Sequence, residues 1–503
     1  MTGQADLAKS QPSLKTQAAA GVKWTGASTA GRTVLQFAQI AVLAHLLSPS
    51  DFGLMGMMLV VLGFAEAFAD MGISNAIIHR QNATREQLSS LYWLNMLSGI
   101  VVFGAVWAAA PLIVALFHER RLAGLVFWVA LIFVITPVGQ QFQILLQKEL
   151  RFRTLAAVEV TATGVGVAVS IVAAFLGQGV LSLIWGQLAN AATRSTLLAG
   201  IGWRAWPPAL RFQRSDLKGY LSFGLYQMGE RSITYFNQRL DQILIGSLLG
   251  ASALGYYTLA FNLAILPVAR INPVITRVAF PVFAKVQDDC DRLRRGYMKV
   301  LSVLSMTNFP LLVGLAVLAP VFVPVVFGGQ WLPSVIPLQI LCFVGLVRTQ
   351  MNPIGSLLLA RGRADLGFHW NAALLASQVI GVWAGARMGG VVGVAISLLA
   401  LHSLYLGLSY VFLIKPVLGP CARDFLGSSW PAFWMSVVMG AFVLCLERAI
   451  RSLAVASGPA LSIGIVFGSM IYLFLARIFR CDDLQEIWGL AFGRPQAAEA
   501  EGI

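Results

Sequence analysis

Long apolar stretches recur along this chain of 503 residues, each bounded by charged residues or by Gly, Pro and Ser. A helix needs about 20 apolar residues to cross the hydrocarbon core of a bilayer, and fourteen of the stretches satisfy that length. Charged residues make up only 12% of the chain and hydrophobic residues 57%, whereas a soluble domain carries about 25% charged residues. The chain is therefore predicted to be an all-α integral membrane protein. The expected spans are 22–47, 52–79, 88–117, 121–147, 154–176, 180–203, 217–249, 252–283, 300–326, 333–359, 364–386, 390–414, 425–446 and 459–478.

The 36 Lys and Arg residues are spread unevenly over the connections between these spans. If both termini are cytoplasmic, 24 of them fall in or beside the cytoplasmic segments and five fall in the outward loops. Basic residues are retained on the cytoplasmic side of a membrane, so this asymmetry supports fourteen spans with both ends inside. It also explains much of the net charge of +14, and no nucleic-acid partner is expected.

An internal repeat relates the two halves of the chain. LLSPSDFGLMGM (46–57) matches LLGASALGYYTL (248–259), which superposes Gly53 on Gly255. Each copy joins two spans, and six spans separate the copies, so both halves enter the membrane in the same direction. Parallel repeats of this kind place a central pathway between two lobes. The predicted organisation is a cytoplasmic N-terminal tail (1–21), an N-lobe of six helices (22–203), a cytoplasmic inter-lobe loop (204–216), a C-lobe of six helices (217–414), two additional helices (415–480) and a cytoplasmic tail (481–503).

Twelve charged residues lie inside the expected spans and away from their end residues, and each costs about 2.5–3.5 kcal/mol at a helix centre. Such residues should face the bundle interior or a water-filled cavity. Four of them, in the first two spans of each repeat, lie about 15–20 Å from the cytoplasmic end: Arg32, Glu66, Arg231 and Arg270. The full set comprises the bases Arg32, Arg194, Arg231, Arg239, Arg270, Arg277 and Arg348 and the acids Glu66, Asp70, Glu159, Glu230 and Asp241.

These charges have two interpretations. Structural ion pairs, such as one between Arg194 and Glu159, explain part of the set, and Arg277 is close enough to the cytoplasmic end to extend toward the headgroups. However, the bases outnumber the acids, and the fixed fork of arginine donors suits phosphate. We therefore favour a cavity for an anionic, phosphate-bearing substrate. The candidate substrate-binding residues are Arg32, Arg231, Arg239, Arg270 and Arg277, and the candidate proton- or cation-coupling residues are Glu66, Asp70 and Asp241.

No metal site, cofactor site or catalytic centre is expected. The five cysteines form no CxxC pair, and the five histidines are dispersed without metal-ligand spacing. The sequence contains no Gly-Lys dipeptide, which excludes the phosphate-binding loop of a nucleotide hydrolase. The chain is accordingly predicted to be a transporter and not an enzyme.

Two segments carry a family resemblance. They are GVKWTGASTAGRTVLQFAQIAVLAHLLSPSDFGLMGM (21–57) and RLDQILIGSLLGASALGYYTLAFNLAILPVARINPVITRVAFPVFAKVQDD (239–289). Both resemble polysaccharide transporters of the multidrug/oligosaccharidyl-lipid/polysaccharide (MOP) exporter superfamily, in particular Wzx-type lipopolysaccharide and exopolysaccharide flippases of the colanic-acid-exporter-like branch. The resemblance covers residues 20–420 approximately and implies a MATE-like fold of two six-helix lobes.

The resemblance also implies an activity. It suggests a flippase that moves an undecaprenyl-pyrophosphate-linked oligosaccharide, the repeat unit of an O-antigen or exopolysaccharide, from the cytoplasmic to the outer leaflet of the plasma (inner) membrane by alternating access. The family's cationic cavity residues correspond here to Arg32, Arg239, Arg270 and Arg277, with Asp241. The partners it implies are the lipid-linked substrate, membrane lipids, and a polysaccharide polymerase with its chain-length machinery.

Two alternatives to a flippase remain. A cation-coupled multidrug exporter with the same fold should have a net-acidic cavity, but here the intramembrane bases outnumber the acids. A membrane-embedded polymerase or ligase usually needs a large outward loop, and all the outward loops expected here are short.

Overall fold

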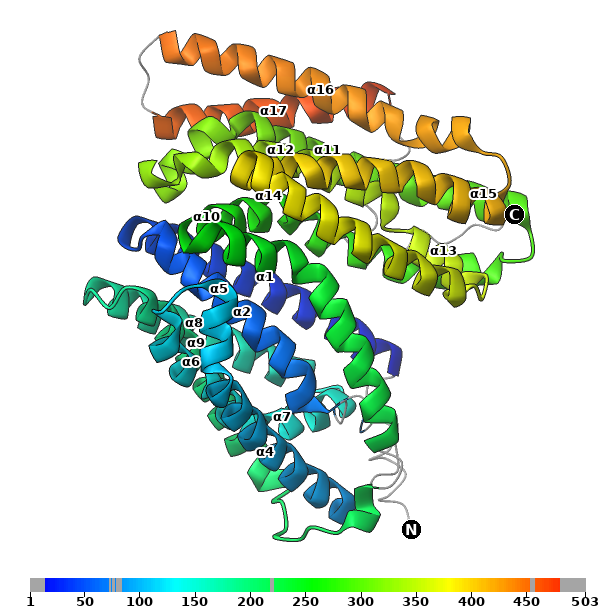
Figure 1. Cartoon of the computed structure of the whole chain (residues 1–503). Coiled ribbons are helices and arrows are strands. Elements are labelled where there is room, and N and C mark those ends of the chain that lie inside the picture. Colours follow the sequence, from blue (N-terminus) through cyan, green and yellow to red (C-terminus); the bar gives the residue numbers. More distant parts are fainter. Residues whose placement is uncertain are drawn as a thin grey trace, which may run out of the picture. The chain divides into compact units, whose positions relative to one another are not determined.

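The computed structural model describes residues 14–71, 74, 77, 84–217, 221–452 and 457–479. Helices account for nearly all of these residues, and no strand occurs among them (Figure 1). The predicted all-α class is therefore confirmed. The tail expected at 481–503 lies outside the described residues, and so does most of the tail expected at 1–21.

The helices follow the expected spans, and several spans consist of two consecutive helices. Those up to residue 217 are α1 (Leu14–Leu46), α2 (Pro49–Asp70), α4 (Arg85–Ala108), α5 (Ala110–Phe117), α6 (Leu122–Ala130), α7 (Ile132–Lys148), α8 (Phe152–Phe175), α9 (Val180–Ala205) and a 3₁₀ turn (Arg214–Leu217). The others are α10 (Leu221–Lys285), α11 (Cys290–Phe327), a 3₁₀ turn (Gly329–Ser334), α12 (Val335–Met351), α13 (Ile354–Ala360), α14 (Ala364–Ser409), a π-helical turn (Tyr410–Ile414), α15 (Lys415–Leu418), α16 (Ala422–Ser452) and α17 (Ser457–Phe479).

Within the described residues, ten helical segments are long and apolar enough to cross a membrane. Two of these have double length, because α10 is broken at Gly250 (φ 83°) and α14 is broken at Gly389 and Gly390 (φ 58° at Gly390). Glycine permits the positive φ that both breaks require. The first and sixth expected spans, α1 and α9, are also helical but are less apolar. Helix α1 contains one arginine, two lysines and three glutamines, and α9 contains two arginines and two amide side chains. All fourteen predicted spans therefore correspond to helices.

The chain divides into two compact units, Met1–Gly255 and Tyr256–Ile503. In the first unit α1 packs against α8, α8 against α9, α9 against α7, α7 against α4, and α4 against α2. This order joins the first six expected spans in one bundle, and the first half of α10 belongs to the same unit. In the second unit α11 packs against α12, α16 and α17, and α12 packs against α14. The finer lobe and tail limits proposed from the sequence stay predictions.

Small residues allow the helices of the first unit to approach closely. A Cβ on Gly166 of α8 would lie 2.7 Å from the carbonyl oxygen of Gly186 on α9. A Cβ on Gly139 of α7 would lie 2.6 Å from the Cα of Ser195 on α9. Close backbone contact of this kind is a common source of helix association in membranes. These contacts fix the positions of α7, α8 and α9, which carry much of the site described below.

Candidate functional site

An ion pair joins α1 to α8 in the first unit. The Arg32 Nη1 lies 2.9 Å from the Glu159 Oε2, and the two side chains are 32% and 24% exposed. The Arg32 Nε is buried and has no hydrogen-bond partner in the part of the chain that the structure describes. The guanidinium therefore retains donor capacity beyond its bond to Glu159. Arg32 was predicted to bind substrate, and the structure adds its acidic neighbour.

A second arginine, Arg194 of α9, lies beside this pair. Its Nη2 donates to the Oε1 of Gln143 on α7. The charges of Glu159, Arg32 and Glu66 all act on the Arg194 guanidinium. The ion pair predicted between Arg194 and Glu159 is therefore wrong. Glu159 forms its ion pair with Arg32 and affects Arg194 only through its charge. Sequence reasoning left Arg194 out of the substrate site, although its depth in the sixth span was a usable signal.

Helices α2 and α10 supply the next part of the site. The Tyr235 hydroxyl donates to the carbonyl oxygen of Leu59 at 2.8 Å, and a Cβ on Gly63 would overlap the Tyr235 ring. The Arg239 Cζ lies 5.9 Å from the centroid of that ring, within range of a cation–π interaction. Glu66 of α2 acts through its charge on Tyr235 as well as on Arg194. Glu66 thus lies near both the Tyr235 ring, which Arg239 contacts, and the Arg194 guanidinium.

The predicted coupling residues on α2 have different surroundings. Glu66 is exposed, whereas Asp70 is buried with 7% exposure. The Asp70 Oδ1 accepts a hydrogen bond of 2.7 Å from the Gln140 Nε2 and a second bond from the Ser74 hydroxyl. The Asn95 Nδ2 bonds to the Gln140 Oε1 at 3.4 Å. Helix α2 therefore carries two carboxylates in different surroundings. Glu66 lies near basic residues, and Asp70 is bonded within a cluster of neutral polar side chains.

Three further candidates lie on the first half of α10. The Arg239 Nη1 donates to the Gln242 Oε1 at 3.1 Å, and the Asp241 Oδ1 accepts from the Gln242 backbone N–H at 2.8 Å. Asp241 is 3% exposed, so it lies in the helix packing and not on an open surface. Arg231 belongs to the same helix, but its side chain falls outside the described residues.

The structure does not add Arg270 and Arg277 to this cluster, because both belong to the second unit. Both side chains are exposed on the second half of α10. Between them, Asn272 is fully buried, and its Oδ1 accepts a hydrogen bond of 2.9 Å from Asn308 of α11. Arg270 and Arg277 therefore lie on an exposed face of the helix, and the buried Asn272 holds that helix against α11.

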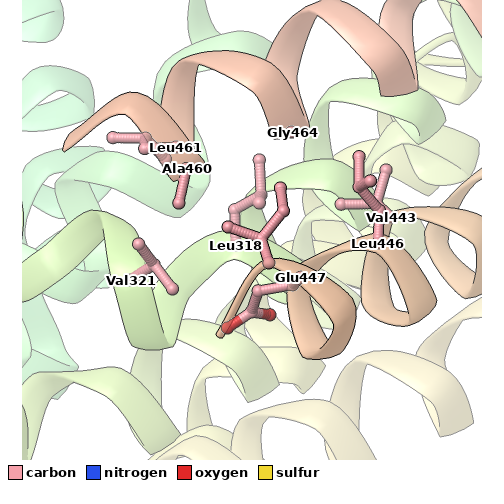
Figure 2. Close-up of a pocket in the computed structure, with 9 residues that line it drawn as sticks. Leu318, Val321, Val443, Leu446, Glu447, Ala460, Leu461 and Gly464 are labelled. Carbon is pink, nitrogen blue, oxygen red and sulfur yellow. The ribbon is translucent and has the colours of Figure 1, made fainter. Parts of the chain in front are cut away.

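A small cavity in the second unit can be set aside as a substrate site. It lies between α11, α16 and α17 (Figure 2) and has a volume of about 10 Å³. This is the space that a single water needs. Glu447 is the one charged side chain among its lining residues, which otherwise are apolar, such as Leu318, Val443 and Leu461. A saccharide or a pyrophosphate does not fit there.

The repeat-equivalent glycines meet at the junction of α2 and α10. A Cβ on Gly53 would overlap the carbonyl oxygen of Ala251, and a Cβ on Gly255 would overlap the carbonyl oxygen of Pro49. The Ser48 hydroxyl and the Asp51 carboxylate form a capping box that begins α2 at this point. The two motifs that the sequence superposes are therefore in direct backbone contact.

Solved structures show which class of protein has this fold. Lipid II flippase MurJ in an inward closed conformation matches with a TM-score of 0.70 at 15% identity, covering 92% of this chain and all of that chain (100%). An inward-facing multidrug resistance MATE family transporter of the MOP superfamily matches with a TM-score of 0.61 at 15% identity, covering 77% of this chain and 94% of that chain. The fold is that of the MOP exporters, as the sequence resemblance implied, and the protein is a multi-pass membrane protein.

The sequence comparisons define the family. A model of the family described as "Polysaccharide biosynthesis protein" matches residues 42–336. Lipopolysaccharide biosynthesis protein WzxC of Escherichia coli (strain K12) is 39% identical, covering 84% of this chain and 86% of that protein. Teichuronic acid biosynthesis protein TuaB of Bacillus subtilis (strain 168) is 34% identical, covering 92% and 96%. The chain therefore belongs to the polysaccharide biosynthesis protein family, and the resemblance found in its sequence is confirmed.

Proposed function

We propose that this protein is a flippase for a lipid-linked oligosaccharide carried on undecaprenyl pyrophosphate. It moves the repeat unit of an O-antigen or exopolysaccharide from the cytoplasmic to the outer leaflet of the inner membrane by alternating access, with both termini in the cytoplasm. The names of its relatives support a role in polysaccharide biosynthesis, and one of them, from Rhizobium meliloti (strain 1021), is named a succinoglycan biosynthesis transport protein. Its partners are the membrane lipids and the polymerase and chain-length machinery that consume the flipped unit.

The observation that carries the proposal is the basic cluster within the first unit. Arg32, Arg194 and Arg239 supply three guanidinium groups, while Glu159 and Glu66 supply two carboxylates. A guanidinium binds phosphate oxygens through parallel hydrogen bonds. The pyrophosphate of the substrate would therefore compete with Glu159 for Arg32, and the acidic partners hold the arginines in place when substrate is absent. A cavity for cationic drugs would need the opposite sign of net charge.

Replacing Arg239 by alanine is expected to reduce surface polysaccharide by about tenfold or more, because a charge-assisted hydrogen bond to phosphate contributes about 1.5–3 kcal/mol. Arg239→Lys keeps the charge without the fork and should be intermediate. The measurement is surface polysaccharide in a deletion strain that expresses each variant at equal, membrane-inserted levels. Arg363→Ala is the matched control, because Arg363 pairs with Asp365 at 3.1 Å on an exposed surface of the second unit.

The same deletion strain tests the transport reaction itself. Without the protein, lipid-linked oligosaccharide should accumulate in the cytoplasm-facing leaflet. If the deletion strain keeps its surface polysaccharide and becomes sensitive to cationic drugs, the protein is a multidrug exporter and not a flippase. Polymerisation of the oligosaccharide by the purified protein would support the membrane-embedded enzyme.

We further propose Asp70, Glu66 and Asp241 as proton- or cation-coupling residues. Asp70→Asn is the sharpest test, because an asparagine Oδ1 can still accept the hydrogen bonds from Gln140 and Ser74. The variant should fold normally, but its transport in proteoliposomes should no longer respond to an imposed pH or sodium gradient. Asp365→Asn serves as the control, since Asp365 is exposed. Unchanged gradient dependence in Asp70→Asn would assign the carboxylate to packing alone.

A further inference from the structure

A cavity of about 230 Å³ opens in the first unit where α4 begins and where α7 and α9 end. Its volume is more than ten times the roughly 10–15 Å³ that one water needs. It is separate from the arginine cluster described above, and neither the expected substrate nor the coupling residues involve it. The residues that line it are Arg85, Leu88, Phe142, Leu145, Leu146, Glu149, Arg151, Ile201, Gly202 and Trp206.

The floor of this cavity is apolar and aromatic. Phe142 is 1% exposed and contacts Trp206 with a centroid separation of 5.9 Å. Gly202 makes room for that ring, since a Cβ there would overlap Phe142. Leu145 and Ile201 are only partly buried and face the open volume. A water-filled cavity with this lining is unfavourable, because no polar side chain on the floor replaces the hydrogen bonds of the water.

The mouth of the cavity carries a net positive charge. Arg85 is exposed in the first turn of α4, and it has no ion-pair partner among the described residues. Arg151 is 3.9 Å from Glu149, and both side chains are about half exposed, so the pair contributes little stability. Arg85 also adds positive charge to the positive end of the helix dipole, which makes an anion at this position favourable.

We propose that this cavity binds an anionic phospholipid of the surrounding bilayer. The phosphate lies between Arg85 and Arg151, and the glycerol and first methylene groups occupy the apolar floor formed by Leu145, Phe142 and Ile201. A soluble phosphate uses only the mouth. A zwitterionic lipid carries the same phosphate and acyl chains, but its ammonium group is repelled by the two arginines, whereas an anionic lipid uses both parts of the site without that repulsion. Basic pockets between membrane helices are known to select anionic headgroups.

Thermal unfolding of the purified full-length protein in detergent tests this site. Phosphatidylglycerol should raise the Tm in a concentration-dependent manner, because a ligand that binds only the folded state stabilises it. Phosphatidylcholine and inorganic phosphate at equal concentration should raise the Tm much less, because the first adds a cation beside the arginines and the second leaves the apolar floor empty. If phosphatidylcholine stabilises the protein equally, the site does not select anionic lipids. If inorganic phosphate stabilises it equally, the ligand is a phosphate group and not a lipid.

Variants separate the two parts of the site. Arg85→Gln and Arg151→Gln should each weaken phosphatidylglycerol binding about fivefold, and the double variant about 25-fold. Ile201→Phe fills the floor with both arginines retained and should also weaken binding. Arg204→Gln is the matched control, because Arg204 is exposed in the last turn of α9 and does not line the cavity. A loss in Arg204→Gln equal to that in Arg85→Gln would overturn the proposal in favour of a general basic surface.

Discussion

Gly53→Ala is expected to destabilise this protein by about 3 kcal/mol, at the upper end of the range for overpacked interiors. The added methyl group would overlap the backbone carbonyl of Ala251. A backbone oxygen cannot rotate away as a flexible side chain can, so α2 and α10 must separate at their junction. The same change at the repeat-equivalent position, Gly255→Ala, should have a similar effect, because its Cβ would overlap the carbonyl oxygen of Pro49.

Thermal unfolding of the detergent-purified protein measures this effect, together with the amount of protein that inserts into the membrane. Gly104→Ala is the matched control, since a Cβ at Gly104 of α4 meets no atom within 4 Å. Alanine there should be neutral or slightly stabilising because of its higher helix propensity. If Gly53→Ala and Gly104→Ala unfold at the same temperature, the close contact of the repeat motifs does not exist in the folded protein.

The spans could be predicted from the sequence because apolar length alone determines whether a helix can cross a bilayer. The alignment of Gly53 with Gly255 was likewise available from the repeat. Their direct contact was not, because a repeat gives equivalence between two segments and says nothing of the distance between them. The close approach depends on the capped start of α2 and on the break at Gly250.

The partners of the intramembrane charges were harder to predict than their presence. Residue spacing gives the depth of a side chain but not the rotation of its helix or the identity of the neighbouring helix. Helix α8 packs against both α1 and α9, so Glu159 had two basic candidates, and it bonds to Arg32. The neutral partners Gln143 and Gln140 were also missed, although the four glutamines of the fourth span were a visible signal.

Reversing the charge of Arg32 should nearly abolish surface polysaccharide. Arg32→Glu places two carboxylates where the structure has an ion pair of 2.9 Å, and it removes a guanidinium proposed to bind the substrate pyrophosphate. Breaking a fully buried pair costs about 3–5 kcal/mol, and partial exposure of both side chains makes the expected loss of stability smaller. Glu159→Arg should also be harmful, because it would bring a third arginine beside Arg32 and Arg194.

The double variant Arg32→Glu/Glu159→Arg separates a structural role of this pair from a role in substrate binding. It restores opposite charges across α1 and α8 and leaves the net charge of the cluster unchanged, so the Tm should return close to that of the wild-type protein. Export should remain defective, because the guanidinium is now on α8 and a carboxylate occupies the position where Arg32 has spare donor capacity at its Nε. Recovery of both the Tm and surface polysaccharide would show that the pair only holds the two helices together. In that case the phosphate must be bound by the remaining arginines of the cluster, Arg194 and Arg239.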